Sequence, residues 1–171
     1  MISLDIVQND EINDLSILAT KIVREHYDPI IGKAQNDYML DKFQSIDGLK
    51  RQIEEGYQFY WINLDNIKVG FFSFKEREDK LYISKLYIDK EYRGRGLSKS
   101  VMAFLKVVAK EKHLPSLFLN VNKRNFETIE IYKRLGFTLL REECNPIGEG
   151  YFMDDYVYEC VIWWPSKRKK R

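Results

Sequence analysis

Two arginines and two glycines alternate in the stretch Arg93-Gly94-Arg95-Gly96, whose composition suits the binding of an anion. Glycine has no Cβ, so its backbone can approach a phosphate closely. An arginine guanidinium can hold two phosphate oxygens at once. A helix that begins just after such a loop adds unpaired N–H groups and the positive end of its dipole. These residue types in this order predict a binding site for phosphate or pyrophosphate.

The residues on either side of this loop predict a strand before it and a helix after it. The apolar run from 81 to 88 is typical of a strand that is buried on both faces. From Leu97 to Val108, apolar residues recur at steps of four, three and four, which is helical spacing. The loop is not a Walker sequence, because no Gly-Lys-Ser/Thr closes it, and it lacks the third glycine of a dinucleotide fingerprint. The alternative interpretation is an ordinary surface turn.

Length and composition favour one globular domain of an intracellular protein. The chain has 171 residues, 44% hydrophobic and 14% aromatic, which is enough to build a core. No apolar run approaches the roughly 20 residues of a membrane span, so no membrane partner is expected. Asp5, Asp10 and Glu11 argue against a signal peptide. Cys144 and Cys160 have no metal-ligand spacing, which predicts no metal site and two reduced thiols in a cytoplasmic protein.

The charge is unevenly distributed along the chain. Five of its 28 basic residues are the last five, and without them 23 basic residues face 26 acidic ones. The body of the protein is therefore mildly acidic, which argues against nucleic acid as a partner. The tail at 165–171 is either a solvated end or a segment that binds nucleic acid or an acidic membrane.

The pattern along the chain predicts seven strands and five helical segments. The strands are expected at 2–7, 57–64, 69–74, 81–88, 117–121, 137–140 and 151–163. The helices are expected from 9 or 10 to about 26, where Pro29 disfavours continuation, and then at 36–43, 45–55, 97–112 and 125–135. A meander followed by alternating strands and helices predicts a mixed α/β sheet with helices on both faces. A ligand is then expected at the carboxyl ends of the central strands.

Two motifs resemble those of the GNAT superfamily of acetyl-CoA-dependent N-acetyltransferases. The segment 93–98 (RGRGLS) is similar to its Q/R-x-x-G-x-G/A signature, with Ser98 in place of the last Gly or Ala. The segment 125–137 (NFETIEIYKRLGF) resembles its N-x-x-A-x-x-x-Y-x-x-x-G-F helix, with Thr128 in place of Ala. The segment 150–155 (GYFMDD) is similar to a bacterial branch that includes polyamine acetyltransferases. The resemblance covers most of the chain.

This resemblance implies a fold and a co-substrate. The expected fold is one domain over 1–164, with a central mixed, mostly antiparallel sheet of about seven strands and helices on both faces, followed by the basic tail. The expected co-substrate is acetyl-CoA, and dimers are common for such folds, so a homodimer is compatible with it. The pyrophosphate would be held by the backbone N–H groups of six residues, Arg93, Gly94, Arg95, Gly96, Leu97 and Ser98.

The resemblance also implies roles for residues on the central strand and the second motif. The strand end formed by Leu86, Tyr87 and Ile88 would pair with the pantetheine arm like an added strand. The N–H near Leu86 would donate to the thioester oxygen as negative charge develops there. Asn125 would contact the pantetheine arm. Tyr132 would give a proton to the departing CoA thiolate, although a tyrosine on an amphipathic helix is more often a core residue.

The residue that removes a proton from the acceptor amine is left open. Many family members place a carboxylate on the central strand, where this chain offers only Ser84 and Lys85. Asp154 or Asp155 acting through water is one interpretation, and the absence of a dedicated base is another; His26 is a candidate by residue type alone. An aromatic wall for a cationic amine is available from Tyr38, Met39, Tyr57, Tyr60, Trp61 and Tyr151, which are equally typical of a core.

The resulting hypothesis is an N-acetyltransferase that transfers the acetyl group of acetyl-CoA to a primary amine of a small molecule, with polyamines as one candidate class. A variant acts on a protein or peptide amine. A non-catalytic acyl-CoA sensor is the alternative from another class, and Tyr132 argues against it because binding alone needs no acid.

Overall fold

The structure, a computed structural model, describes residues 1–162. The strands in this part of the chain are β1 (Ile2–Ile6), β2 (Gln58–Leu64), β3 (Ile67–Arg77), β4 (Lys80–Ile88), β5 (Ser116–Asn122), β6 (Thr138–Gly148) and β7 (Tyr151–Val161). The α-helices are α1 (Ile12–Ile31), α2 (Lys33–Met39), α3 (Ile46–Glu54), α4 (Leu97–Glu111) and α5 (Phe126–Arg134). Short turns of other helix types are η1 (Asn9–Glu11), η2 (Leu40–Gln44) and η3 (Lys90–Tyr92). Within residues 1–162, no helix combines the length and hydrophobicity that a membrane crossing requires.

The strands form one mixed sheet in the order β1-β2-β3-β4-β5-β7-β6. The pairs β1–β2, β2–β3, β5–β7 and β6–β7 are antiparallel. The pair β4–β5 is parallel and aligns Leu81 with Leu117 and Ile83 with Leu119. The predicted mixed, mostly antiparallel sheet of seven strands is therefore confirmed for the described residues.

The chain divides into two compact units that share strand β4. The first unit comprises Met1–Lys75 and Lys85–Ser98, and the second begins with Glu76–Ser84 and continues from Lys99. The first therefore contains the carboxyl end of β4 and the glycine loop, and the second contains β5 to β7 with α5. The single domain over 1–164 stays a prediction, and the basic tail at 165–171 lies outside the described residues.

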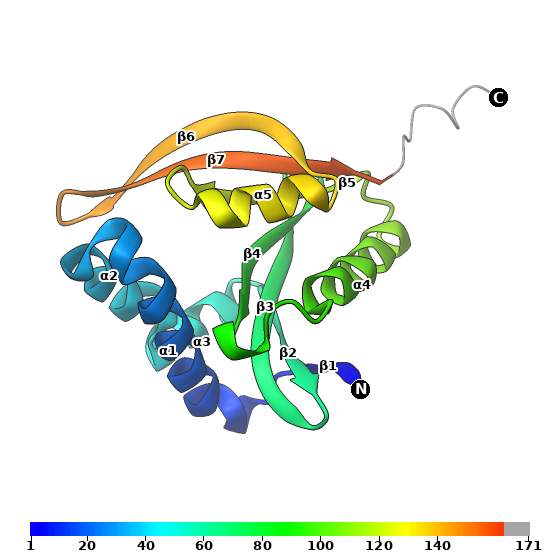
Figure 1. The fold of residues 1–171 in the computed structure, drawn as a ribbon, viewed down its shortest axis with the longest axis horizontal. Helices are drawn as coiled ribbons and strands as arrows, with labels where there is room; N and C mark the ends of the chain where they lie inside the picture. Colours follow the sequence, from blue (N-terminus) through cyan, green and yellow to red (C-terminus); the bar gives the residue numbers. More distant parts are fainter. Residues whose placement is uncertain (163–171) are drawn as a thin grey trace. The chain divides into compact units, whose positions relative to one another are not determined.

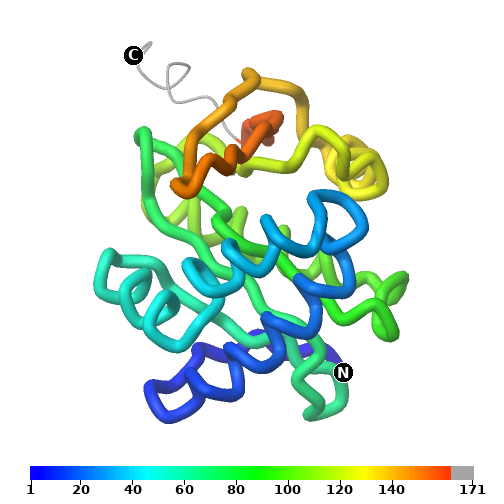
Figure 2. The backbone as a smooth tube through the Cα atoms, turned by 90° about the vertical axis from the view of Figure 1, so that its left-hand side faces the viewer, coloured from blue at the N-terminus to red at the C-terminus, as the bar shows by residue number. Residues whose placement is uncertain are grey.

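The core of the first unit lies where α1 and α3 pack on β2 and β3. Its buried members are Ile12, Leu15, Ala19, Leu49, Phe59, Trp61 and Phe71. The apolar residues of α1 recur at helical spacing and those of β2 at alternate positions, so each element has one apolar face to bury. Figure 2 shows the two helices beside each other. This packing fixes the strands that lead to the carboxyl end of β4.

Helix α1 is longer than predicted, because Pro29 does not interrupt it. The helix continues to Ile31 and ends at Gly32, whose φ is 87° and whose N–H donates to the carbonyl of Asp28 at 3.0 Å. Pro29 lacks an N–H and removes one helical hydrogen bond, and the bond from Gly32 N–H to Asp28 O closes the last turn around it. The buried side chain of Asn36 also donates to Asp28 Oδ1 at 2.7 Å, which ties this turn to α2. The predicted break near residue 26 is therefore wrong.

Strand β4 is buried on alternate residues and not on both faces. Leu81, Ile83 and Lys85 are buried, whereas Ser84 and Leu86 are only partly covered. The prediction of burial on both faces is wrong because the burial of a strand depends on the elements that pack against it, and the residues of β4 alone do not reveal them. The two-residue turn that leads into it, Glu78-Asp79, has φ of 57° and 59°, as a tight hairpin requires.

Strands β6 and β7 form a long hairpin in the second unit (Figure 1). β6 extends to Gly148, well past the predicted strand at 137–140. Its second half is mostly exposed and contains Pro146, and both features are compatible with a strand at the edge of a sheet. The same features remove the alternation of apolar and polar residues by which a half-buried strand is predicted. The predicted last strand is present as β7, and residue 163 at its expected end lies outside the described residues.

Candidate functional site

The predicted anion loop in the first unit has the backbone shape that the sequence indicated. Gly94 has φ of 77° and Gly96 has φ of 76°, a conformation that side chains with a Cβ rarely adopt. No atom lies within 4 Å of the position that a Cβ would take at either residue. Leu97 is buried and begins the fifteen-residue helix α4. The loop therefore presents open glycine backbone at the start of a helix, which fits a phosphate group.

Both arginines of the loop are exposed. Arg93 Nε donates to the carbonyl of Ile88 at 3.1 Å, and the Arg95 guanidinium lies 5.4 Å from the centre of the Tyr92 ring. A guanidinium has five N–H groups, so this single bond leaves Arg93 with further donors for an anion. The bond also fixes Arg93 to the end of β4.

Asp89, which the sequence analysis did not single out, anchors the loop. Its N–H donates to Val69 O at 2.8 Å, and its carboxylate accepts from Lys21 Nζ at 2.7 Å and from the Glu91 N–H at 3.1 Å. Burial opposes ionisation of Asp89, but the bonds from Lys21 and Glu91 outweigh burial and hold its pKa below the ordinary value. An aspartate just before a polar turn is a signal for such a cap. Asp89 therefore positions the loop.

The segment predicted to pair with pantetheine is held from one side by β3. A Cβ on Gly70 would lie 2.4 Å from Tyr87 O, so only glycine permits this approach of the two backbones. The Tyr87 ring packs edge-on against Phe71 and Tyr27, with centroids 5.5 and 6.4 Å away. Leu86 lies beside Tyr87 in β4 and is partly exposed. The sequence analysis missed Gly70, whose role depends on a distant carbonyl.

Lys85 is a buried lysine on the same strand, 7% exposed. Its Nζ donates to the carbonyl of Phe43 at 3.4 Å and lies 5.9 Å from the centre of the Phe43 ring. Among the described residues, no carboxylate lies within ion-pair distance of it. Burial in this apolar setting lowers the pKa of Lys85 to about 7.

In the second unit, the Asn125 motif forms the helix that was predicted. Asn125 is 2% exposed and occupies the N-cap position of α5, and its carbonyl accepts from Ile129 N–H at 3.0 Å. Its side chain makes no capping bond in this position. Tyr132 is 8% exposed, and its ring lies 5.6 Å from that of Phe137. The carbonyl of Tyr132 accepts from the Phe137 N–H at 3.0 Å, which fixes the end of the helix.

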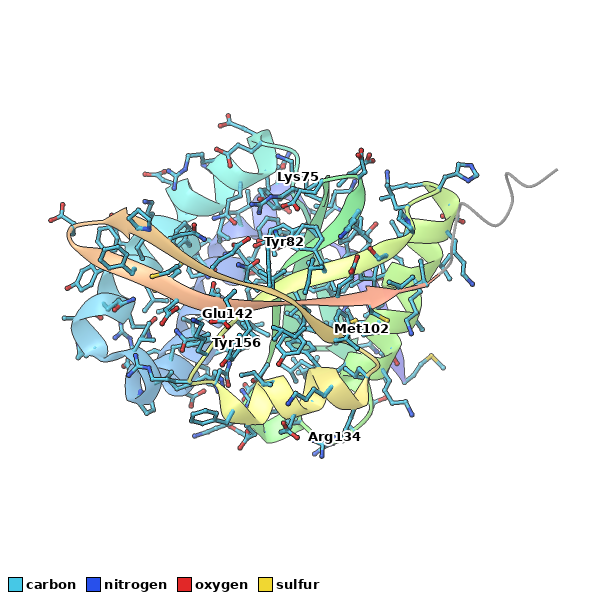
Figure 3. All side chains as sticks on the ribbon, turned by 90° about the horizontal axis from the view of Figure 1, so that it is seen from above. Lys75, Tyr82, Met102, Arg134, Glu142 and Tyr156 are labelled. Atoms are coloured by element: carbon cyan, nitrogen blue, oxygen red, sulfur yellow. The ribbon has the colours of Figure 1, made fainter. Side chains whose placement is uncertain are left out.

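The two carboxylates proposed as alternatives point to opposite faces of β7. Asp154 is exposed and pairs with Lys123 at 3.0 Å. Lys123 also pairs with Glu142 at 2.7 Å and lies over the ring of Tyr156 at 5.5 Å. Figure 3 labels Glu142 and Tyr156, which face each other across β6 and β7. Asp154 therefore belongs to a surface ion pair.

Asp155, in contrast, is 3% exposed. The amide of Asn120 donates to Asp155 Oδ2 at 3.4 Å and to Glu143 Oε1 at 3.2 Å, which links β5, β6 and β7. Burial raises the pKa of Asp155 to about 6, and the negative charges of Glu143 and Asp154 add to the effect. The sequence shows two adjacent aspartates but not which of them is buried.

Trp61 is not part of an acceptor pocket. It is 2% exposed in the core of the first unit, and its indole N–H donates to Glu11 Oε1 at 3.0 Å. An open groove of about 840 Å³ does occur in this unit. Its lining contains none of the predicted site residues and consists of Ser16, Thr20, Arg24, Lys33, Asp37, Leu40, Asp41, Ser45, Ile46 and Asp47.

Comparison with known families agrees with the two motifs. The model of the acetyltransferase (GNAT) family matches residues 20–137, which include both. The chain therefore belongs to this family, as the two motifs predicted.

Relatives of known name differ in their substrates. The chain is 30% identical over 78 residues to the peptidyl-lysine N-acetyltransferase YjaB of Salmonella typhimurium, a match that covers 45% of this chain and 50% of that protein. It is 27% identical over 62 residues to a probable spermine N(1)-acetyltransferase of Bacillus subtilis subsp. natto, covering 36% of this chain and 41% of that protein. The matches thus span about half the length of these relatives or less.

Solved structures share the fold. The PaiA N-acetyltransferase of Thermoplasma acidophilum, solved with coenzyme A, has a TM-score of 0.80 at 18% identity, covering 95% of this chain and 99% of that one. The ribosomal-protein-S18-alanine N-acetyltransferase of Escherichia coli has a TM-score of 0.68 at 15% identity, covering 96% of each chain. At these identities the likeness establishes the fold alone.

Proposed function

We propose that this protein transfers the acetyl group of acetyl-CoA to a primary amine of a small molecule. The observation that carries the proposal is the loop at 93–98, with open glycine backbone, two exposed arginines and a helix that begins at Leu97. Family membership supports acetyl-CoA as the group bound there. Bound acetyl-CoA supplies an activated acetyl group.

The residues of the first unit would bind and orient the co-substrate. Backbone N–H groups of the loop at 93–98 would hold the pyrophosphate, with Arg93 and Arg95 adding positive charge. The end of β4, at 86–88, would pair with the pantetheine arm. The N–H near Leu86 would donate to the thioester oxygen. One such fixed donor contributes about 2.7–4 kcal/mol to rate acceleration in other enzymes.

The residues of the second unit would complete the chemistry. Asn125 would contact the pantetheine arm from its buried position at the start of α5. Tyr132 would donate its hydroxyl proton to the sulfur as the carbon–sulfur bond breaks. Fixation of the helix end by the bond from Phe137 N–H to Tyr132 O supports this role, because a proton donor must be held in place.

Two classes of acceptor amine have support. Similarity to a probable spermine acetyltransferase and the mildly acidic body favour a cationic small amine such as a polyamine. Similarity to a peptidyl-lysine acetyltransferase favours a lysine side chain as the second candidate. Both substrates present a primary ammonium group, so the same chemistry applies to each.

The test is thiol release from acetyl-CoA with spermine, spermidine, free amino acids, an aminoglycoside and a lysine peptide, with the product identified by mass. We expect the wild type to acetylate at least one of these amines. Tyr132→Phe should retain acetyl-CoA affinity and lose about 10²-fold or more in kcat, the usual size of a general acid effect. Binding of acetyl-CoA without transfer, together with an unchanged Tyr132→Phe variant, would support the sensor interpretation.

A further inference from the structure

We infer that Asp155 is the general base that removes the proton from the acceptor ammonium. This inference rests on the proposed function and selects between alternatives that the sequence left open. Asp154 is exposed and pairs with Lys123, whereas Asp155 is buried on the other face of β7. The strand alternates strictly here, because β5 and β7 pair without a bulge from Asp155 to Val161.

The position of Asp155 places it beside the segment that leads to Tyr132. Asp155 lies directly opposite Asn122, the last residue of β5. The carbonyl of Asn122 accepts from Asn125 N–H at 3.0 Å, and α5 begins at the next residue. Neighbouring strands lie about 4.7–4.9 Å apart. The carboxylate is therefore one strand away from the turn that begins the second family motif.

The acid and the base lie on different faces of this part of the sheet. Gly136, which follows α5, has its Cβ position 3.9 Å from Cys160 Sγ. Cys160 is five residues after Asp155 in the same uninterrupted register, so the two side chains point to opposite faces. The helix of Tyr132 thus approaches one face and Asp155 occupies the other.

Charged groups around Asp155 adjust it for proton uptake. On β6, Arg141 Nε donates to Glu143 Oε2 at 2.7 Å, and this bond is the main cause that holds the pKa of Glu143 below its ordinary value. Glu143 therefore keeps its negative charge, which opposes ionisation of its neighbour Asp155. Asn120 on β5 and Lys123 beyond it act in the opposite direction. Two adjacent carboxyl groups whose pKa values move apart are typical of acid–base sites.

The proton balance of the step is complete. Asp155 takes one proton from R–NH₃⁺, and the free amine forms a C–N bond with the acetyl carbon. The C–S bond breaks with its electron pair on sulfur, which receives the proton of the Tyr132 hydroxyl. The second proton of the nitrogen returns to the tyrosinate, and Asp155 releases its proton to solvent. The products are the acetamide, CoA thiol and one proton.

The experiment is the pH profile of kcat/KM between pH 5 and 9, measured on the wild type and four variants. The acceptor is whichever of spermine, spermidine or the lysine peptide the wild type acetylates fastest. The wild-type rate should rise with pH through a limb near 6, because the base must be ionised. Asp155→Asn should lose that limb and fall about 10²-fold or more at pH 7.5. Asp155→Glu, which keeps a carboxylate, should restore the limb in part.

The neighbouring carboxylates provide matched controls. Asp154→Asn should retain the limb and a rate within about threefold of the wild type, as an exposed ion pair has little effect. Glu143→Gln should retain the limb and move it to lower pH. An Asp155→Asn variant that keeps the limb, or loses less than about fivefold, overturns the inference alone. A wild type that binds acetyl-CoA but acetylates no amine overturns the proposed function and this inference together.

Discussion

Lys85 and Asp155 are both buried ionisable groups on strands of the same sheet, and their surroundings differ. Lys85 has one long hydrogen bond, to a carbonyl, and burial alone lowers its pKa to about 7. Asp155 has an amide donor, a neighbouring ionised carboxylate and a nearby lysine, so several groups act on its pKa besides burial. A buried charge without a partner is a cost to stability, whereas a buried charge within a polar network can be adjusted for a reaction. The comparison teaches that burial alone does not mark a catalytic group.

The units also differ in what they contribute to the proposed reaction. The first unit holds the glycine loop and its anchor Asp89, which would serve binding in this proposal. The second holds Asp155 and Tyr132, which would serve proton transfer. Variants in the first unit should therefore change affinity for acetyl-CoA, and variants at these two residues should change kcat.

The largest effect is expected for Gly96→Glu. A side chain at φ 76° is strained, and its carboxylate would repel the pyrophosphate, so affinity for acetyl-CoA should fall more than about 10³-fold. Gly150→Glu is a matched control, since Gly150 has φ of 78° and equally open surroundings. Calorimetric titration with acetyl-CoA should give near-wild-type affinity for this control. Equal losses in the two variants would remove the loop from the binding site.

The next largest effect is expected for Lys85→Met, which keeps the apolar stem and removes the amine. Between about pH 7 and 10.5 the unfolded chain holds a proton that the native lysine has lost, so wild-type stability rises with pH across this window. Lys85→Met should therefore be more stable by about 5 kcal/mol at pH 6, with a difference that shrinks towards pH 10. Urea unfolding at both pH values measures this. If Lys85→Met lowers kcat more than about tenfold, Lys85 also takes part in catalysis, and it does not differ from Asp155 in the way described.

A smaller gain in stability is expected for Asp155→Asn. Between about pH 4 and 6 the native state holds a proton that the unfolded chain has lost, so wild-type stability falls as pH rises across this window. The variant should be more stable by about 3 kcal/mol at pH 7 and within about 1 kcal/mol of the wild type at pH 4. Thermal unfolding at the two pH values is the measurement. Greater stability together with lower activity is typical of a catalytic group, whereas a variant that loses stability would assign Asp155 a structural role.

The smallest effect is expected for Asp154→Asn. Its ion pair with Lys123 is exposed, and Lys123 keeps Glu142 as a second partner. The free energy of unfolding at pH 7 should change by less than about 0.5 kcal/mol. If Asp154→Asn changes the free energy of unfolding as much as Asp155→Asn does, the difference in burial between the two aspartates has no effect on stability.

Local patterns in the sequence predict most of the fold and the binding loop. Alternation and helical spacing place the strands and helices, and the glycines place the loop at 93–98. Pro29 misleads because the bonds that hold its turn join Asp28 to Gly32 and to Asn36, and the residues before the proline do not reveal them. The second half of β6 is missed because it is mostly exposed and contains Pro146, so its pairing with β7 leaves no apolar pattern.

The sequence does not predict those features of the candidate site that depend on which residues are neighbours in space. The roles of Asp89 and Gly70 follow from contacts with Lys21 and Tyr87, which lie far away in the sequence or on another strand. The choice between two adjacent aspartates depends on which face of β7 is covered. The alternation of side chains along a strand predicts only that Asp154 and Asp155 point to opposite faces.

The most direct test of this account is a titration of the Asp155 side-chain carboxyl carbon by NMR in the wild-type protein. We expect a midpoint near pH 6 in the wild type and a lower midpoint in Glu143→Gln, because the neighbouring negative charge is removed. A midpoint near 4 that does not respond to Glu143→Gln would contradict the account. The charges around Asp155 would then have no bearing on proton transfer.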